Sequence, residues 1–327
     1  MSFGLWCLSI LLFARNAFAQ SNPNGSSSDD VFITPNGYNI RNNGTVGPLI
    51  RLTGWEGCDV KDPCNPDLDK KAAIKKGFED MQTMIPAWED VPDPSDPPEN
   101  SYDVNWEDAA AVEFFGSFQR TGEHRSNVQT NLNMLAQQEN NIIGWSLHVR
   151  CDDPSHECGG IYDQAYTSHR AETYDHINFC DGYFRLRNLA EALDFGSQPT
   201  YRDNIIAYQS KAMTWAHELL HVSWLGKVSV LDQPYIKDEL YSSNPKFQAY
   251  KAIDTKWLAF SDIPPGYGPA NNPNTYAYFT MAKYVMKKKD YYPSSPIWST
   301  NSDPPPRFVL ADNFTEIESP TSCPTKI

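Results

Sequence analysis

Apolar residues recur at helical intervals in several parts of this chain. Across residues 66–85 the intervals are four, three and four, set by Ile74, Phe78, Met81 and Ile85. Asp67 precedes this pattern and is placed to cap its first turn. Similar spacing predicts further helices over 105–115, 127–139, 182–193, 202–225, 247–260 and 275–286.

Residues 142–149 have the composition of a strand and run directly into Cys151. Residues 31–53 have short apolar pieces and Asn-Gly turn signals, which fit either a hairpin or part of a pro-segment. Helical patterns therefore dominate, and the fold class that we expect is α+β, mostly helical with a small sheet. Outside these elements, residues 20–65 form an N-terminal extension or pro-segment, and residues 291–327 form a proline-rich tail. The folded domain is expected over residues 66–290.

The first 19 residues have the pattern of a secretory signal peptide. An apolar run over residues 3–14 is followed by Ala17-Phe18-Ala19, a cleavage site of small residues around one larger residue. We therefore expect a secreted, extracellular protein. No other stretch approaches the roughly 20 apolar residues that a membrane helix needs, so we expect no membrane anchor.

Cleavage after Ala19 removes Cys7 and leaves an even number of cysteines, which predicts three disulfides in a secreted chain. These cysteines are Cys58, Cys64, Cys151, Cys158, Cys180 and Cys323. A cysteine-rich metal site is the alternative, but no Cys-x-x-Cys pair is present. Glycosylation sequons begin at Asn24, Asn43 and Asn313, and they predict a glycoprotein.

The composition is acidic, with a formal net charge of −14. An acidic surface repels phosphate backbones, and the largest basic cluster is only Lys287-Lys288-Lys289, so we expect no nucleic-acid partner. The charge keeps a secreted protein soluble, or it attracts basic substrates.

The strongest chemical signal is the motif His217-Glu218-Leu219-Leu220-His221. A helix places positions i and i+4 on one face, so both imidazoles can bind one metal ion, and zinc suits this geometry. Glu218 would project beside them, where a carboxylate can take a proton from the attacking water and return it to a leaving amine. Two surface histidines on an amphipathic helix are the alternative, but the apolar neighbours would bury most of this helix.

A catalytic zinc needs a third protein ligand and an open position for water or substrate. No histidine follows His221, so a carboxylate must supply the third ligand. The downstream carboxylates are Asp232, Asp238, Glu239, Asp254 and Asp262. Spacing favours Asp232, because Gly226 can end the helix and turn the chain back toward the metal. Asp238 and Glu239 would suit a second helix packed against the first.

At these residues the chain resembles the fungal deuterolysins and peptidyl-lysine metalloendopeptidases, the aspzincins. In that family a His-Glu-x-x-His helix is completed by the Asp of an Asp-x-x-Tyr motif on the following loop. Here Asp232-Gln233-Pro234-Tyr235 matches that motif.

The resemblance extends beyond the loop, over roughly residues 67–287. It includes the segment from Cys151 to Cys180 and the residues 274–279, which read Asn-Thr-Tyr-Ala-Tyr-Phe. The chain departs from the family beside the motif, where Val228-Ser229 and Ile236 replace the usual Gly-Thr and Gly.

The resemblance implies a zincin-like metalloprotease domain that holds one Zn²⁺ per chain through His217, His221 and Asp232. It also implies that Glu218 is the general base and that Tyr235 stabilises the oxyanion. The expected partners are protein or peptide substrates, and we expect a monomer.

Two alternatives stay open. The first is a secreted zinc-binding or host-interaction protein with a catalytically impaired site, against which the intact Glu218 argues. The second is a zincin whose last ligand is Glu239. Family members that cleave before lysine place acidic side chains in the substrate pocket, and Asp254 and Asp262 are the residues that would form such a pocket here.

Overall fold

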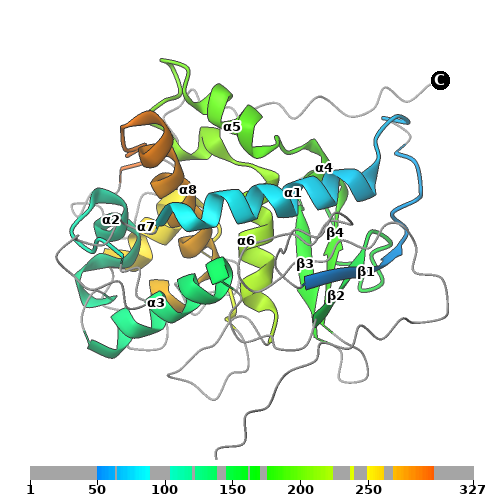
Figure 1. Cartoon of the computed structure of the whole chain (residues 1–327), viewed down its shortest axis with the longest axis horizontal. Helices are drawn as coiled ribbons and strands as arrows, with labels where there is room; N and C mark the ends of the chain where they lie inside the picture. Colours follow the sequence, from blue (N-terminus) through cyan, green and yellow to red (C-terminus); the bar gives the residue numbers. More distant parts are fainter. Residues whose placement is uncertain are drawn as a thin grey trace, which may run out of the picture. The chain divides into compact units, whose positions relative to one another are not determined.

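The computed structural model describes residues 50–62, 65–88, 104–119, 122–137, 145–160, 163–169, 175–223, 236–238, 249–260 and 268–297 (Figure 1). The predicted signal peptide, the sequons and much of the proline-rich tail lie outside these residues. The described part is α+β, as predicted, with helices around one small mixed sheet.

The sheet has four strands in the order β1-β2-β4-β3. These are β1 (Ile50–Glu56), β2 (Trp145–Arg150), β4 (His176–Phe179) and β3 (Ala165–Ser168). β2 runs parallel to both of its neighbours, whereas β3 is antiparallel to β4 and forms one edge. The sequence pattern predicted β2 but not β3 and β4, which have four residues each and are too short to show a period.

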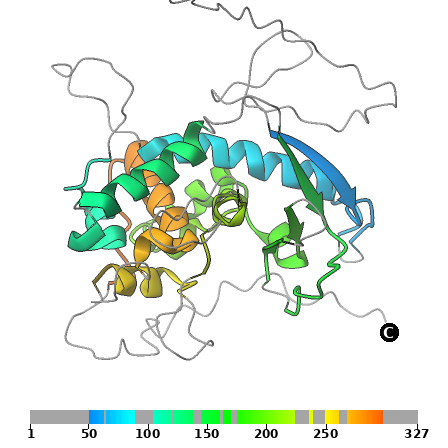
Figure 2. The same cartoon turned by 90° about the horizontal axis from the view of Figure 1, so that it is seen from below.

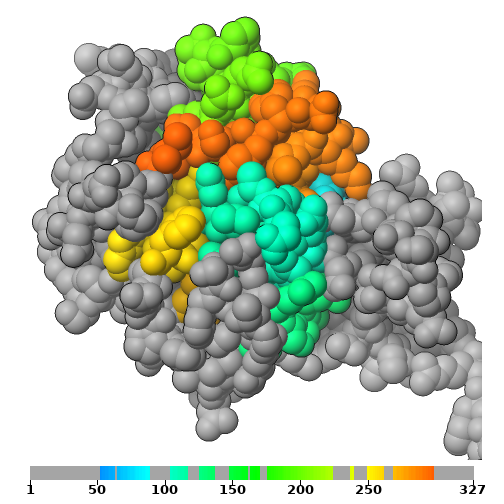
Figure 3. Space-filling view, turned by 90° about the vertical axis from the view of Figure 1, so that its left-hand side faces the viewer, coloured from blue at the N-terminus to red at the C-terminus, as the bar shows by residue number. Residues whose placement is uncertain are grey.

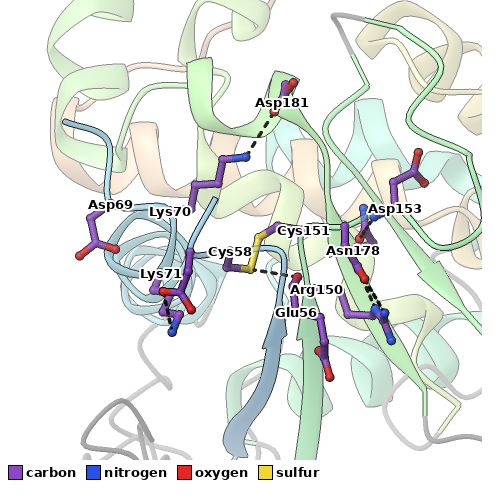
Figure 4. Close-up of a disulfide and its surroundings, with 12 residues drawn as sticks. Glu56, Cys58, Asp69, Lys70, Lys71, Arg150, Cys151, Asp153, Asn178 and Asp181 are labelled. Carbon is purple, nitrogen blue, oxygen red and sulfur yellow. Dashed lines mark hydrogen bonds and ion pairs between the residues drawn. A yellow bond between two sulfur atoms is a disulfide. The ribbon is translucent and has the colours of Figure 1, made fainter. Parts of the chain in front are cut away.

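Two disulfides fasten the ends of the strands. Cys58 follows β1 and is bonded to Cys151, which follows β2 (Figure 4). Cys158 is bonded to Cys180 at the end of β4. The prediction of disulfides is therefore confirmed for four cysteines, while Cys64 and Cys323 lie outside the described residues.

The centre of the core lies where α1 (Lys70–Met84) crosses α6 (Lys211–His221). Trp215 of α6 is fully buried between Phe78 of α1 and Phe179 of β4, with ring centroids 4.8 and 4.9 Å away. Gly77 allows this close approach, because a Cβ there would lie 3.0 Å from Cβ of Lys211 and 3.1 Å from Cδ1 of Trp215, both on α6. The crossing therefore holds α6 rigidly along the face that carries Trp215.

Helix α6 lies between the sheet on one side and four helices on the other, as two perpendicular views show (Figures 1 and 2). The four are α2 (Ala109–Gln119), α3 (Gly122–Gln137), α7 (Ala252–Phe260) and α8 (Pro273–Lys289). Side chains of α2, α7 and α8 pack into one continuous surface (Figure 3). Ion pairs join them beneath it: Lys256 contacts Glu113 at 2.5 Å, and Lys283 pairs with Asp108.

Two predicted helices are interrupted in the structure. The helix expected over 182–193 is divided into α4 (Asp181–Arg185) and α5 (Leu189–Gly196), because Asn188 and Glu191 form a capping box that starts a new helix. The helix expected over 202–225 is divided into the 3₁₀ helix η2 (Ile205–Tyr208) and α6.

The ends of the remaining helices also differ from prediction. Asp69, not Asp67, caps α1, since its carboxylate accepts a hydrogen bond of 2.9 Å from the Ala72 amide. Helix α6 stops at His221 because Val222 adopts an extended backbone. Short 3₁₀ helices follow α1 and precede α8, at η1 (Ile85–Trp88) and η3 (Pro269–Asn271).

The folded body extends beyond the predicted range of 66–290 at both ends. The expected extension contributes β1 and Cys58 to the sheet region. In the expected tail, the hydroxyl of Tyr292 donates to Glu113 at 2.6 Å, and the amide of Ser295 donates to the Asp203 carbonyl at 2.6 Å. None of the described helices is long and apolar enough to cross a membrane.

Candidate metal centre

The two histidines of the motif lie on one face of α6, as their spacing predicts. Their Nε2 atoms are 3.0 Å apart, and their ring centroids are 4.8 Å apart. With Glu218, they offer three potential ligand atoms that all lie within 4.8 Å of one another. This cluster can hold a metal ion.

A third side chain reaches both histidines from residues 236–238. Oδ1 of Asp238 lies 3.4 Å from Nε2 of His217, and its Oδ2 lies 3.6 Å from Nε2 of His221. Each carboxylate oxygen therefore lies near one of the two nitrogen atoms. Asp238 was one of the carboxylates that we considered downstream of the motif, and the described residues 236–238 have no regular secondary structure.

The hydrogen bonds of His221 leave Nε2 available to a metal. Nδ1 lies 2.7 Å from the main-chain carbonyl of Ile236, and a carbonyl oxygen can only accept. Nδ1 therefore carries the proton, and in the neutral ring Nε2 presents its lone pair toward His217 and Asp238. Metal-binding histidines are commonly oriented in this way, by a carbonyl that accepts from the other ring nitrogen.

Two buried polar atoms at the centre have no hydrogen-bond partner among the described residues: Nδ1 of His217 and Oδ1 of Asp238. An unsatisfied buried polar atom costs about 1–3 kcal/mol. A cation bound between the imidazoles and the carboxylate would satisfy Oδ1 of Asp238. The donor set therefore fits a metal ion.

The electrostatics of the cluster also favour positive charge. Burial lowers the pKa of His221, but the hydrogen bond to Asp238 and the charges of Asp238 and Glu218 outweigh it and raise the pKa to about 9. Burial likewise raises the pKa of Asp238, but His217 and His221 outweigh it and lower the pKa to about 2. With neutral imidazoles, the two carboxylates carry two negative charges, which a divalent cation would balance.

Glu218 is almost fully buried, with 3% of its surface exposed. Its Oε1 lies 3.8 Å from Nε2 of His217, and its Oε2 lies 2.8 Å from the hydroxyl oxygen of Thr167 on β3. Asp238 contacts both histidine nitrogens more closely than Glu218 contacts His217. Asp238 is therefore better placed than Glu218 to be a third metal ligand beside the two histidines.

Tyr250 approaches the cluster from the side of Asp238. Its hydroxyl donates a hydrogen bond of 3.0 Å to Oδ2 of Asp238, and its ring centroid is 6.4 Å from that of His217. Partial burial, and then the charges of Asp238 and Glu218, raise the pKa of Tyr250. The phenol therefore stays protonated and remains a donor. No sequence signal had pointed to Tyr250 or Thr167, because each belongs to the site through tertiary contact alone.

Four further predicted site residues cannot be compared with the structure. Asp232, Tyr235, Glu239 and Asp262 lie outside the described residues, so their predicted roles stay predictions. Asp254 lies in the first turn of α7, where its carboxylate accepts a 3.4 Å hydrogen bond from the Lys251 amide, and burial raises its pKa.

A signal for Asp238 was present in the sequence. After the His-Glu-x-x-His motif the Asp-x-x-Tyr pattern occurs twice, first at Asp232-Gln233-Pro234-Tyr235 and again at Asp238-Glu239-Leu240-Tyr241. Spacing from the helix favoured the first copy, whereas the structure places the aspartate of the second copy against the histidines.

Compared with models of known protein families and with curated proteins, the sequence matches none. The resemblance to the aspzincins therefore rests on the motifs quoted above. The case for function rests on the geometry of the metal centre.

Proposed function

We propose that this protein is a secreted, extracellular zinc metalloendopeptidase with a zincin-like domain. The observation that carries the proposal is the convergence of His217, His221 and Asp238 beside the buried carboxylate of Glu218. Two imidazoles and one carboxylate suit a catalytic zinc, which keeps one further position for water or substrate. The signal-peptide pattern and the disulfides support secretion.

Zinc bound at this centre would polarise the scissile carbonyl and acidify the attacking water. Glu218 supplies the proton acceptor: Oε1 takes the proton as the water oxygen bonds to the carbonyl carbon. Glu218 then gives this proton to the amide nitrogen, so that the C–N bond breaks and an amine leaves. Its burial strengthens these interactions, because the surroundings screen charge less than water does.

We assign the third ligand to Asp238 because its carboxylate faces both histidines. With Asp238 as the ligand, the Asp-x-x-Tyr motif of the family matches Asp238 and Tyr241 instead of Asp232 and Tyr235. The tyrosine that donates to the oxyanion is then either Tyr235 or Tyr241. Replacing each tyrosine with phenylalanine decides between them. The true donor should lose about a hundredfold in kcat with KM nearly unchanged.

The alternative of a zinc-binding protein without catalysis is less consistent with the site. A protein that only binds zinc has no need of a general base, yet Glu218 is retained, buried and hydrogen-bonded to Thr167. Expected substrates are proteins or peptides. The acidic composition would favour basic ones by attraction.

Metal analysis combined with digestion of a peptide library tests the proposal. Purified protein should contain one zinc per chain and cut library peptides, with cut sites read by mass spectrometry. Glu218→Gln should keep the zinc and abolish cutting, because an amide cannot accept the proton. Glu79→Gln makes the same change on an exposed face of α1 and should keep full activity.

The outcomes separate the parts of the proposal. If the purified protein binds no zinc and cuts no peptide, the proposal of a zinc metalloendopeptidase is rejected. Undiminished cutting by Glu218→Gln would remove Glu218 from the mechanism. Enrichment of lysine after the cut site would support the acidic pocket that the resemblance implies, and an even distribution would reject the pocket without affecting the zinc chemistry.

A further inference from the structure

A hydroxyl group on the edge strand of the sheet reaches the general base. Oγ1 of Thr167 lies 2.8 Å from Oε2 of Glu218 and 3.0 Å from the main-chain oxygen of the same residue. Both partners are acceptors, so Thr167 is the donor. The hydroxyl has one hydrogen, which the two oxygens share, and the shorter distance favours the carboxylate.

The two carboxylate oxygens of Glu218 consequently differ. Oε2 is bound by Thr167, whereas Oε1 faces the metal centre, 3.8 Å from Nε2 of His217. Without this hydrogen bond, the carboxylate could rotate about its last side-chain bond. It could then present both oxygens to a cation, because Glu218 is close enough to His217 and His221 to act as a ligand itself.

We propose that Thr167 is a positioning residue that holds Glu218 as a proton acceptor and keeps it from becoming a metal ligand. This inference rests on the proposed function, since it presupposes that Glu218 is the base. A base acts efficiently only when it is held in the geometry of the reaction, and a displacement of about 1 Å can cost about a hundredfold in rate.

The strand that carries Thr167 is itself held firmly. Thr167 is paired with the fully buried Ile177 of β4, so β3 cannot shift without disturbing the core. A second contact lies one helical turn earlier on α6, where the hydroxyl of Thr214 donates to Oε1 of Gln164, the residue before β3, at 2.6 Å. Two hydroxyl groups thus connect α6 to this edge of the sheet, and only Thr167 touches Glu218.

This pair of contacts provides a matched control. Thr167→Val removes the hydroxyl that binds Glu218 and keeps the shape of the side chain. Thr167→Ser keeps the hydroxyl and loses only a methyl group. Thr214→Val removes the other hydroxyl contact between α6 and the sheet edge and leaves Glu218 with its partner.

The experiment measures zinc content, thermal stability, kcat and KM of the wild type and these three variants. Crystal structures of the zinc-loaded proteins add a readout that does not depend on activity. Thr167→Val should keep its zinc and a KM within about twofold, while kcat falls by about ten- to a hundredfold. Its Glu218 carboxylate should leave the wild-type position or contact the metal. Thr167→Ser should restore kcat, and Thr214→Val should lower stability alone.

Several outcomes would overturn the inference. If Thr167→Val keeps the wild-type kcat, the positioning role of Thr167 is overturned. The proposed function stays intact in that case, provided that Glu218→Gln is inactive. An equal fall of kcat in Thr214→Val would show that Thr167 acts only through the packing of α6. If the wild type binds zinc but cuts no peptide, the proposed function fails. If the Glu218 carboxylate keeps its wild-type position in crystals of Thr167→Val, the positioning role of Thr167 is rejected separately.

Discussion

The hydroxyl of Tyr250 lies 3.0 Å from Oδ2 of Asp238 and donates its hydrogen to that carboxylate. Asp238 in turn faces the Nε2 atoms of His217 and His221. Tyr250 therefore orients the residue that we assign as the third ligand. Such outer contacts typically contribute ten- to a hundredfold to metal affinity, by fixing the ligand in the binding geometry.

Tyr250→Phe should consequently lower zinc affinity by about ten- to a hundredfold, because the carboxylate of Asp238 loses its orienting donor. Competition with a chromophoric chelator measures the change. Tyr201→Phe alters a tyrosine that stacks on Phe195, and it should keep wild-type affinity. Unchanged zinc affinity in Tyr250→Phe would show that its hydrogen bond does not orient Asp238.

The choice of third ligand is tested by three alanine variants. Asp238→Ala should lower zinc affinity by more than about a hundredfold, since loss of a ligand exceeds the effect of an outer contact. Asp232→Ala and Glu239→Ala should keep most of the affinity. A titration in which Asp232→Ala loses zinc and Asp238→Ala retains it would return the ligand role to the first Asp-x-x-Tyr copy.

Removal of the metal should make stability dependent on pH. Without zinc, the pKa of His221 is raised from 6.5 to about 9, mainly through Asp238 and despite burial. A raised histidine pKa stabilises the fold fully below pH 6.5, and the stabilisation is lost as the pH rises through about 9. Urea titrations of chelator-treated protein should therefore show falling stability over this interval.

The zinc-loaded protein is the control for this pH dependence, because a bound cation takes the place of the proton on His221. Its stability should change little between pH 6.5 and 9. Zinc binding at pH 7 should also release protons, which calorimetry in buffers of different ionisation enthalpy detects. Equal pH dependence with and without zinc would place the metal away from His221.

The end of α6 is tied to the start of β4 through Asp175. Its Oδ2 accepts hydrogen bonds from the amide and the hydroxyl of Ser223, at 2.9 and 2.5 Å, and its Oδ1 lies 3.0 Å from Nδ1 of His169. Asp175→Ala should lower the free energy of unfolding by about 1–2 kcal/mol, because it removes hydrogen bonds that each contribute about 0.5–1.5 kcal/mol. Urea denaturation measures this loss.

Asp194→Ala removes an exposed carboxylate from α5 and serves as the control, with an expected change within about 0.5 kcal/mol. Equal effects of the two substitutions would mean that the contacts of Asp175 do not stabilise the protein. Zinc affinity should also fall in Asp175→Ala, since Ser223 lies two residues after His221 and fixes the direction in which the chain leaves the helix.

Local patterns in the sequence were sufficient to predict the helix that carries the motif and the convergence of its two histidines. The contact between His217 and His221 follows from helix geometry alone, so it needs no knowledge of the fold. The α+β class and β2 were predictable for the same reason, because periodicity is a property of neighbouring residues. Helix ends were less predictable: the capping box at Asn188 interrupts a continuous apolar pattern.

Tertiary structure alone decided which distant side chains complete the centre. Thr167 and Glu218 are 51 residues apart in sequence, and they meet because α6 packs against the edge strand of the sheet. Asp238 reaches the histidines because the chain returns to them after α6. The sequence after the helix contains two Asp-x-x-Tyr patterns, so it did not decide which aspartate lies there. Contacts within one helical turn are set by backbone geometry, whereas contacts across the fold depend on how whole elements pack. A sequence motif therefore identifies the chemistry of the first ligands but not the residue that closes the site.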